Sequence, residues 1–376
     1  MRTLLHFLEN QYVQYLGTGI VAFILCYVSI PVVITVSQMK QLHAVPNERS
    51  SHGKVVPNLG GVGIFIGLFI SFLMFGPGPM ERGISLFLAG ILILFFIGIK
   101  DDILIIAPMK KLAAQVIAAT LLVFGANLRI DSMFGIFGIY ELPFIISYLL
   151  TVFTLIVITN AYNLIDGVDG LAASIGILIA GVFGWFFWIN EYPNYVCLSI
   201  GLMASLLAFL RFNFSKERKI FMGDTGSLLV GFVLAVFVVK FLRIHSVEES
   251  NFHFNNPAIV AVILLLMPLY DTLRVFMVRV NQGRSPMSAD KNHIHHFFLK
   301  KGFVHYQTTL MIFIMTVIAF LIMIPLTESM ALPQAFWMMV GLFALYSLIL
   351  KPRGKGFRRS KRRHMVWKAR KMFKMK

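Results

Sequence analysis

The stretch FTLIVITNAYNLIDGVDGLAASIGILIA, residues 153–180, decides the fold because it places two carboxylates between two apolar runs. Asp166 and Asp169 stand at the break, beside Gly167 and Gly170. A run of about 20 apolar residues is long enough to cross the hydrocarbon core of a membrane. The stretch therefore predicts two membrane-spanning helices joined by a polar turn.

Similar apolar runs recur along the whole chain. Of its 376 residues, 58% are hydrophobic and 14% are charged, and the mean hydropathy is +0.79, far from the composition of a soluble globular domain. We predict an all-α, polytopic membrane protein with one multi-pass domain over residues 1–350 and a basic tail over 351–376. Its eleven spans are expected at 16–36, 60–75, 84–99, 112–126, 143–159, 168–188, 195–210, 226–242, 257–280, 308–326 and 333–350.

Positive residues are distributed unevenly between the two sides of these spans. One side holds 29 of the 34 Lys and Arg residues. Because Lys and Arg are retained in cytoplasmic loops, we predict the amino terminus outside and the carboxyl terminus in the cytoplasm. The tail holds 13 of these cations and no acid, so beside a bilayer we expect it to bind anionic lipids and not nucleic acid.

Aspartates gather on the same inner side. Seven of the nine acids there are Asp, against one of the eight outer acids. Asp101 and Asp102 directly follow a span in FIGIKDDILIIAPMKK, where Lys110 and Lys111 open the next span, and Asp224 in RKIFMGDTGSLLVGF begins another. Short carboxylates at helix ends suit Mg²⁺, which binds one or two carboxylates together with substrate phosphates.

Asn163, Asp166 and Asp169 follow an i, i+3, i+6 spacing, which puts them on one face if the segment is helical. Gly167 and Gly170 allow a break instead, and both arrangements stay open. Any one of these aspartates could serve only as a helix cap. Three Asp-bearing motifs on one membrane face favour a functional site, because ionisable groups at membrane depth are costly.

A histidine-rich segment, GRSPMSADKNHIHHFFLKKG, follows the ninth span. His293, His295 and His296 suit anion binding together with Arg284 and Lys291. Zinc is less favoured, because no further Cys or Glu completes a ligand set. A solvated loop is the alternative.

Two further polar elements face the same side. Pro268 and Asp271 predict a kinked or broken ninth helix whose inner end reaches this region. Arg49, His52 and Lys54 in the first inner loop are candidate phosphate ligands. A site of aspartates, cations and histidines at the cytoplasmic surface suits phosphoryl transfer between a soluble nucleotide and a lipid, because its catalysis consists largely of positioning and charge neutralisation.

In order and spacing, KDD, NAYNLIDGVDGL, IFMGDTGSLLVG and DKNHIHH resemble the motifs of the polyprenyl-phosphate N-acetylhexosamine-1-phosphate transferases, glycosyl transferase family 4. The HIHH sequence is similar to that of the branch making undecaprenyl-pyrophosphoryl-GlcNAc for teichoic acids and other surface polymers. The resemblance implies a homodimer in the bacterial plasma membrane that converts UDP-GlcNAc and undecaprenyl phosphate to GlcNAc-pyrophosphoryl-undecaprenol and UMP, using Mg²⁺ or Mn²⁺.

The resemblance also implies residue roles. Asp224 is expected to bind the metal, and Asp101 and Asp102 to lie at the reacting phosphates as catalytic groups and metal ligands. Phe221 is expected to stack on uracil, and Lys110 and Lys111 are expected to bind substrate. The remaining expected residues are Asn163, Asp166 and Asp169 in the nucleotide pocket, and His293, His295 and His296 at the phosphate or sugar.

The reaction route stays open at this point. A phosphate monoester with a second pKa near 6 is mostly dianionic at pH 7, so a general base contributes little, while a covalent aspartyl-phosphate is chemically possible. One alternative function is a sister enzyme acting on another UDP-N-acetylhexosamine or on the MurNAc-pentapeptide of peptidoglycan synthesis. Another is an ion-coupled transporter, for which internal repeats and acids near the midplane are typical.

Overall fold

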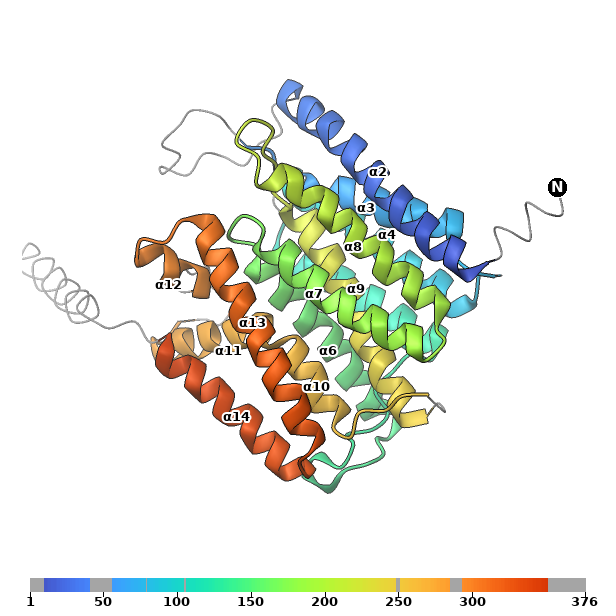
Figure 1. Ribbon diagram of the computed structural model, residues 1–376, viewed down its shortest axis with the longest axis vertical. Helices are drawn as coiled ribbons and strands as arrows, with labels where there is room; N and C mark the ends of the chain where they lie inside the picture. The colour runs from blue at the N-terminus through green and yellow to red at the C-terminus, as the bar shows by residue number, and fades with distance from the viewer. Residues whose placement is uncertain are drawn as a thin grey trace, which may run out of the picture. The chain divides into compact units, whose positions relative to one another are not determined.

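The computed structural model describes residues 10–40, 56–78, 80–104, 106–247, 251–284 and 293–350. Over these ranges the chain is helical, with an isolated bridge between Ser132 and Glu141 and no strand (Figure 1). The helices are α2 Gln11–Met39, α3 Gly60–Phe75, α4 Arg82–Leu104, α5 Pro108–Thr120, η1 Leu121–Gly125, η2 Ile136–Gly138, α6 Phe144–Ile165, α7 Leu171–Ile189, α8 Pro193–Asn213, α9 Gly223–Val247, α10 Pro257–Leu264, α11 Leu266–Asn281, α12 Ile294–Lys300, α13 His305–Glu328 and α14 Leu332–Ile349.

Each predicted span overlaps a helix of the structure or, for the ninth, a pair of helices. Among the described residues, nine helices are long and apolar enough to cross a membrane, and the pair α10 and α11 brings the number up to ten. The remaining predicted span, 60–75, is the apolar helix α3, whose 16 residues fall short of the usual length of about 20. The prediction of an all-α polytopic membrane protein is confirmed.

Chain contacts divide the protein into two units, Met1–Met339 and Val340–Lys376. The second unit contains the end of α14 together with the predicted basic tail. That tail, and the predicted ligands Arg49, His52, Lys54 and Lys291, lie outside the described residues. The functional features described below all belong to the first unit.

Helix α9 forms the core of the first unit. It packs against α3, α4, α6 and α7. In its most apolar stretch of 18 residues, 94% of the residues are buried, against 22% in the corresponding stretch of α2. Glycines allow this close packing. A Cβ on Gly61 of α3 would lie 2.1 Å from the backbone nitrogen of Gly226 on α9. The start of α9 is therefore held next to the ends of α3, α4 and α6.

In the region of the predicted ninth span, α10 and α11 meet at 77° about Leu265. Pro268 stands in the first turn of α11. It has no N–H to donate to the Leu264 carbonyl, and its ring would clash with that carbonyl in a continuous helix. The bend therefore falls three residues before the proline.

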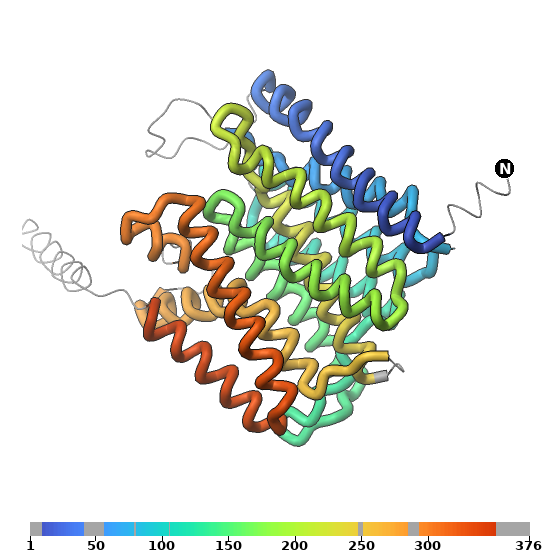
Figure 2. The backbone as a smooth tube through the Cα atoms, viewed as in Figure 1, coloured from blue at the N-terminus to red at the C-terminus, as the bar shows by residue number. Residues whose placement is uncertain are grey.

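Several connections gather at one end of the first unit. Figure 2 shows the green turn between α6 and α7, the yellow-green loop between α8 and α9, and the orange α12 at the same end. The turn covers residues 166–170 and the loop 214–222. Polar segments that are far apart in sequence are thereby collected into one region.

Candidate active site

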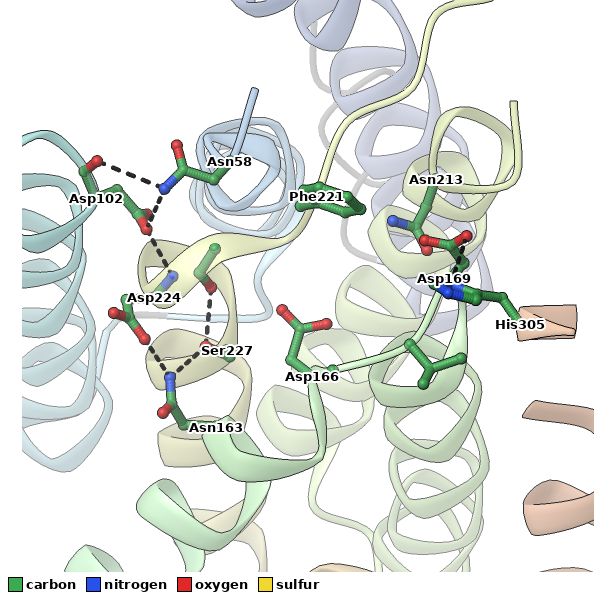
Figure 3. A pocket seen from close by; sticks show the side chains of 13 residues that line it. Asn58, Asp102, Asn163, Asp166, Asp169, Asn213, Phe221, Asp224, Ser227 and His305 are labelled. Atoms are coloured by element: carbon green, nitrogen blue, oxygen red, sulfur yellow. Dashed lines mark hydrogen bonds and ion pairs between the residues drawn. The ribbon is translucent and has the colours of Figure 1, made fainter. Parts of the chain in front are cut away.

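The ends of α4, α6, α8, α9 and α13 enclose a cavity of about 360 Å³ (Figure 3). Polar side chains dominate its lining, with four aspartates among them. The lining residues are Asn58, Asp102, Asn163, Asp166, Gly167, Val168, Asp169, Asn213, Phe221, Gly223, Asp224, Ser227 and His305.

Asp102, at the end of α4, caps the start of α9. Its two carboxylate oxygens accept the backbone N–H groups of Asp224 and Thr225, each at 2.9 Å, and the Thr225 hydroxyl at 2.5 Å. Asn58 donates a further hydrogen bond at 3.1 Å. Because the first N–H groups of a helix lack partners within it, this distant carboxylate fixes where α9 begins.

The cap also explains why the first residue of α9, Gly223, is a glycine. Its φ is +72°, and a Cβ there would lie 1.8 Å from the Asn58 carbonyl oxygen and 2.7 Å from the Asp102 carboxylate. Only glycine fits this conformation and this space. The GDTG sequence is therefore needed to turn the chain tightly into α9.

Asp224 is held between two helices. Lys111 of α5 donates to one carboxylate oxygen at 2.8 Å, and Asn163 of α6 donates to the other at 2.5 Å. Lys111 also forms an ion pair with the buried Asp101, which accepts the Ile106 N–H at 2.7 Å. Lys111 thus bridges two carboxylates and offsets their mutual repulsion.

Asp166 stands at the end of α6 and points into the cavity (Figure 3). Within the described part of the chain, its carboxylate has no hydrogen bond or ion pair. Burial, followed by repulsion from Asp224, Asp102 and Asp169, raises the pKa of Asp166 to about 7. It is therefore a half-buried carboxylate placed to meet a cation or a donor group on a ligand.

Asp169, three residues later, is paired with side chains from two other elements. Lys219 donates to its Oδ2 atom at 2.6 Å, and His305 Nδ1 lies 3.0 Å from the same oxygen. Burial alone would raise the pKa of Asp169, but the hydrogen bonds from His305 and Lys219 outweigh it and lower the pKa. The Oδ1 atom is buried and has no partner among the described residues.

The loop that carries Phe221 is tied to the turn that carries Asp169. Buried Asn213 accepts the Gly170 N–H at 2.5 Å and donates to the Ile220 carbonyl at 2.8 Å. Phe221 is 39% exposed, and the Lys219 ammonium lies 5.3 Å from its ring centroid. An accessible aromatic ring therefore covers one side of the cavity.

The predicted histidines lie behind the 166–170 turn instead of on the cavity wall. His293 Nδ1 is 2.9 Å from Asp271, which also accepts the Ile294 N–H. The His295 ring packs on Gly167, where a Cβ would lie 2.3 Å from its Nε2 atom. Burial, and then the neighbouring histidines, lower the pKa of His295 to about 3, so His295 is neutral at pH 7 and supports the turn.

The remaining predicted residues are placed differently. His296 packs beside His295, with ring centroids 4.4 Å apart. Lys110 and Arg284 are exposed and do not line the cavity.

Sequence reasoning missed several residues of this site. Asn58, Asn213, Ser227 and His305 line the cavity, and Lys219 neutralises Asp169. The sequence feature that could have indicated two of them is position, because His305 lies where a predicted span begins on the inner side and Asn213 lies where another ends there. Isolated polar residues at helix ends are common, so this signal alone could not select them.

A divalent cation fits the carboxylate side of the cavity. The described residues contain no group of three or more His, Cys, Asp or Glu arranged as a metal site. Mg²⁺, however, often takes only one or two protein carboxylates and completes its shell with phosphates and water. Asp224 and Asp166 both line the cavity, and both retain acceptor capacity.

Comparison with known proteins identifies similar sequences. A sequence model described as glycosyl transferase family 4 matches residues 84–242. The undecaprenyl-phosphate alpha-N-acetylglucosaminyl 1-phosphate transferases of Escherichia coli O157:H7 and Yersinia pestis are 29% and 27% identical, each over 81% of both chains. The probable undecaprenyl-phosphate N-acetylglucosaminyl 1-phosphate transferase of Bacillus subtilis strain 168 is 32% identical over 72% of this chain and 73% of its own.

Proposed function

The chain belongs to glycosyl transferase family 4 and is a multi-pass bacterial membrane protein, and from this premise we propose its reaction. It transfers GlcNAc-1-phosphate from UDP-GlcNAc to undecaprenyl phosphate, giving undecaprenyl-pyrophosphoryl-GlcNAc and UMP. The names of its relatives support undecaprenyl phosphate as the acceptor and N-acetylglucosaminyl 1-phosphate as the transferred group. The product would begin the synthesis of teichoic acid or another surface polysaccharide.

The observation that carries the proposal is the position of Asp166. This carboxylate faces a cavity that also presents Asp224 and the exposed ring of Phe221. Bases stack on aromatic rings, and a diphosphate requires cations beside it. The cavity therefore combines a surface for uracil with carboxylates suited to a phosphate-bound metal.

In the overall reaction, a phosphate oxygen of the lipid bonds to the phosphorus attached to GlcNAc. The bond from this phosphorus to the oxygen shared with the UMP phosphate breaks, and UMP leaves with that oxygen. Bound Mg²⁺ would neutralise charge on these phosphates, with Asp224 and Asp166 as its protein ligands. Lys111 and Asn163 hold Asp224 in place.

The two adjacent aspartates of α4 receive different roles in this proposal. Asp101 orients Lys111, while Asp102 caps α9 and so positions Asp224. The hydrogen bonds from α9 and Asn58 occupy both Asp102 oxygens, so we assign Asp102 to positioning and not to metal binding. A homodimer, and anionic lipids at the basic tail, complete the proposed partners.

The test is UMP release by the purified full chain in detergent, with undecaprenyl phosphate and either UDP-GlcNAc, UDP-GalNAc or UDP-MurNAc-pentapeptide. We expect release with UDP-GlcNAc alone, its loss on adding EDTA, and its return with excess Mg²⁺ or Mn²⁺. Release with a different donor alone would overturn the assignment of the sugar. Release that persists in EDTA would contradict the proposed metal.

A further inference from the structure

The position of Asp224 depends on two separate helices staying in register. Lys111 approaches it from α5, and Asn163 from α6. Sliding α5 along α6 by about 1.5 Å, the rise of one residue, would withdraw one of these donors. Some contact between the two helices has to prevent this movement.

A pair of amides joins α5 to α6 one turn from these donors. Asn160 Nδ2 donates to Gln115 Oε1 at 2.7 Å, and Gln115 Nε2 donates to Asn160 Oδ1 at 3.3 Å. Gln115 follows Lys111 by four residues, so both lie on one face of α5. Asn160 precedes Asn163 by three residues, so both lie on one face of α6.

The amide pair favours one register of α5 on α6, because few other hydrogen-bond partners are available to these side chains in an apolar helix pair. Gln115 is 2% exposed, and both helices are long and apolar enough to span a membrane when α5 is counted with η1. Asn160 also donates to the Ile156 carbonyl at 2.8 Å, which fixes its orientation. Separating the amides would leave buried polar groups without partners, which is costly.

We propose that Gln115 and Asn160 form an amide clasp that sets the register of α5 on α6 and thereby holds Lys111 and Asn163 against Asp224. The inference rests on the proposed function, because the geometry being held is that of the proposed transfer site. Neither amide lines the cavity formed by the described residues. Both are therefore positioning residues and not catalytic ones.

The same helix pair supplies a matched control. The Thr120 hydroxyl of α5 and the Tyr148 hydroxyl of α6 lie 3.1 Å apart, toward the other end of the two helices. Replacing Tyr148 by Phe removes this bond without changing the amide pair. It separates a general loosening of the two helices from a loss of register at the site.

The experiment measures kcat, KM and thermal unfolding for Gln115→Leu, Asn160→Leu, Tyr148→Phe and the exchange Gln115→Asn with Asn160→Gln. We expect kcat to fall about 10- to 100-fold in the two leucine variants, as for a displacement of about 1 Å, with little change in KM for UDP-GlcNAc. The exchange variant still has one Asn and one Gln facing each other, so the two side chains together span the same distance. Its kcat should therefore be much closer to the wild-type value than that of the leucine variants. Tyr148→Phe should keep the wild-type kcat.

Several results would overturn the clasp. One is full kcat in Gln115→Leu, another is an equal loss of kcat in Tyr148→Phe, and a third is an exchange variant that is as slow as the leucine variants. Stability gives a readout independent of transfer. Lys111→Met should destabilise the Gln115→Leu protein less than the wild type, whereas additive losses would contradict coupling.

The two hypotheses fail in distinguishable ways. If the wild type releases no UMP from any donor, the proposed function is wrong, while the stability coupling still decides whether the clasp exists. If the wild type is active, the leucine variants keep full kcat and the stability losses of Lys111→Met and Gln115→Leu are additive, the proposed function stands and the clasp is wrong.

Discussion

Asp166 differs from the other cavity aspartates in having no partner among the described residues, and this has consequences for stability as well as for activity. Asp102, Asp169 and Asp224 each accept hydrogen bonds, whereas Asp166 faces their charges across the cavity. A carboxylate retained despite such repulsion is typical of a functional site.

We therefore expect Asp166→Asn to abolish transfer and to raise the unfolding temperature of the ligand-free protein. The folded-state pKa of about 7 lies above the unfolded value of about 3.9, so the folded state binds more protons between these values. The stability contributed by Asp166 falls as pH rises through this window and is constant above it. The gain from Asn should be largest above pH 7 and absent below pH 4, as measured by thermal unfolding across pH. An active Asp166→Asn protein would contradict the assignment.

Phe221 supplies the only exposed phenyl ring in the cavity lining described here. Stacking of a base on an aromatic ring contributes about 1–3 kcal/mol. We expect Phe221→Leu to raise KM for UDP-GlcNAc about 10-fold or more, with a smaller change in kcat. Phe221→Tyr, which keeps the ring, is the control in steady-state assays. An unchanged KM in the leucine variant would remove Phe221 from the donor site.

At the scale of the element, α9 is the helix whose position matters most, since it carries Asp224 and lies within the core. The carboxylate of Asp102 on α4 caps it, in place of a side chain just before α9. Neighbouring Asp101 has different partners, namely Lys111 and the Ile106 N–H. The two adjacent aspartates can therefore be distinguished experimentally.

We expect Asp102→Asn to destabilise the protein by about 0.5–2 kcal/mol, the range for a lost helix cap, because an NH₂ group replaces one of the two accepting oxygens. It should also lower kcat because Asp224 moves. Asp101→Asn is the comparison, since it weakens the ion pair with Lys111 and leaves the cap intact. Chemical or thermal unfolding in detergent gives the stabilities. If Asp102→Asn changed only the Mg²⁺ dependence of transfer and not stability, Asp102 would be a metal ligand.

The turn from α6 to α7 resolves an ambiguity in the sequence. The i, i+3, i+6 spacing allowed a continuous helix, but α6 ends at Ile165 and Gly170 adopts a φ of +75°. A Cβ on Gly170 would lie 2.0 Å from the Phe214 ring. Because of this break, Asp166 faces the cavity centre while Asp169 reaches Lys219 and His305.

For the whole molecule, the distribution of Lys and Arg predicts that this end of the bundle faces the cytoplasm. Exposed Glu217 lies in the loop at the cavity end, and exposed Glu191 lies in the connection at the opposite end of α8. In a protein without its two natural cysteines, we expect the Glu191→Cys variant to react with an impermeant maleimide in intact cells. The Glu217→Cys variant should react only after the membrane is opened, and the reverse pattern would invert the predicted topology.

The sequence by itself determined the class of the protein and indicated most of the residues of the candidate site. Long apolar runs leave a membrane-spanning helix as the stable structure, because backbone polar groups have no water partners in lipid. The Asp-bearing motifs beside the inner ends of these runs indicated Asp102, Asn163, Asp166, Asp169 and Asp224, all of which line one cavity, and Asp101, which does not. Motif order also identified the family.

Only the tertiary structure decided what each of these residues does. Capping of α9 by Asp102, the bridge from Lys111 to Asp224, and the pairing of Asp169 with His305 join segments that are distant in sequence. Helix periodicity reports which face a side chain occupies but not which neighbouring helix lies against it. Packing around α9 makes that choice, and with it separates the carboxylate that has no partner among the described residues from those that hold the site together.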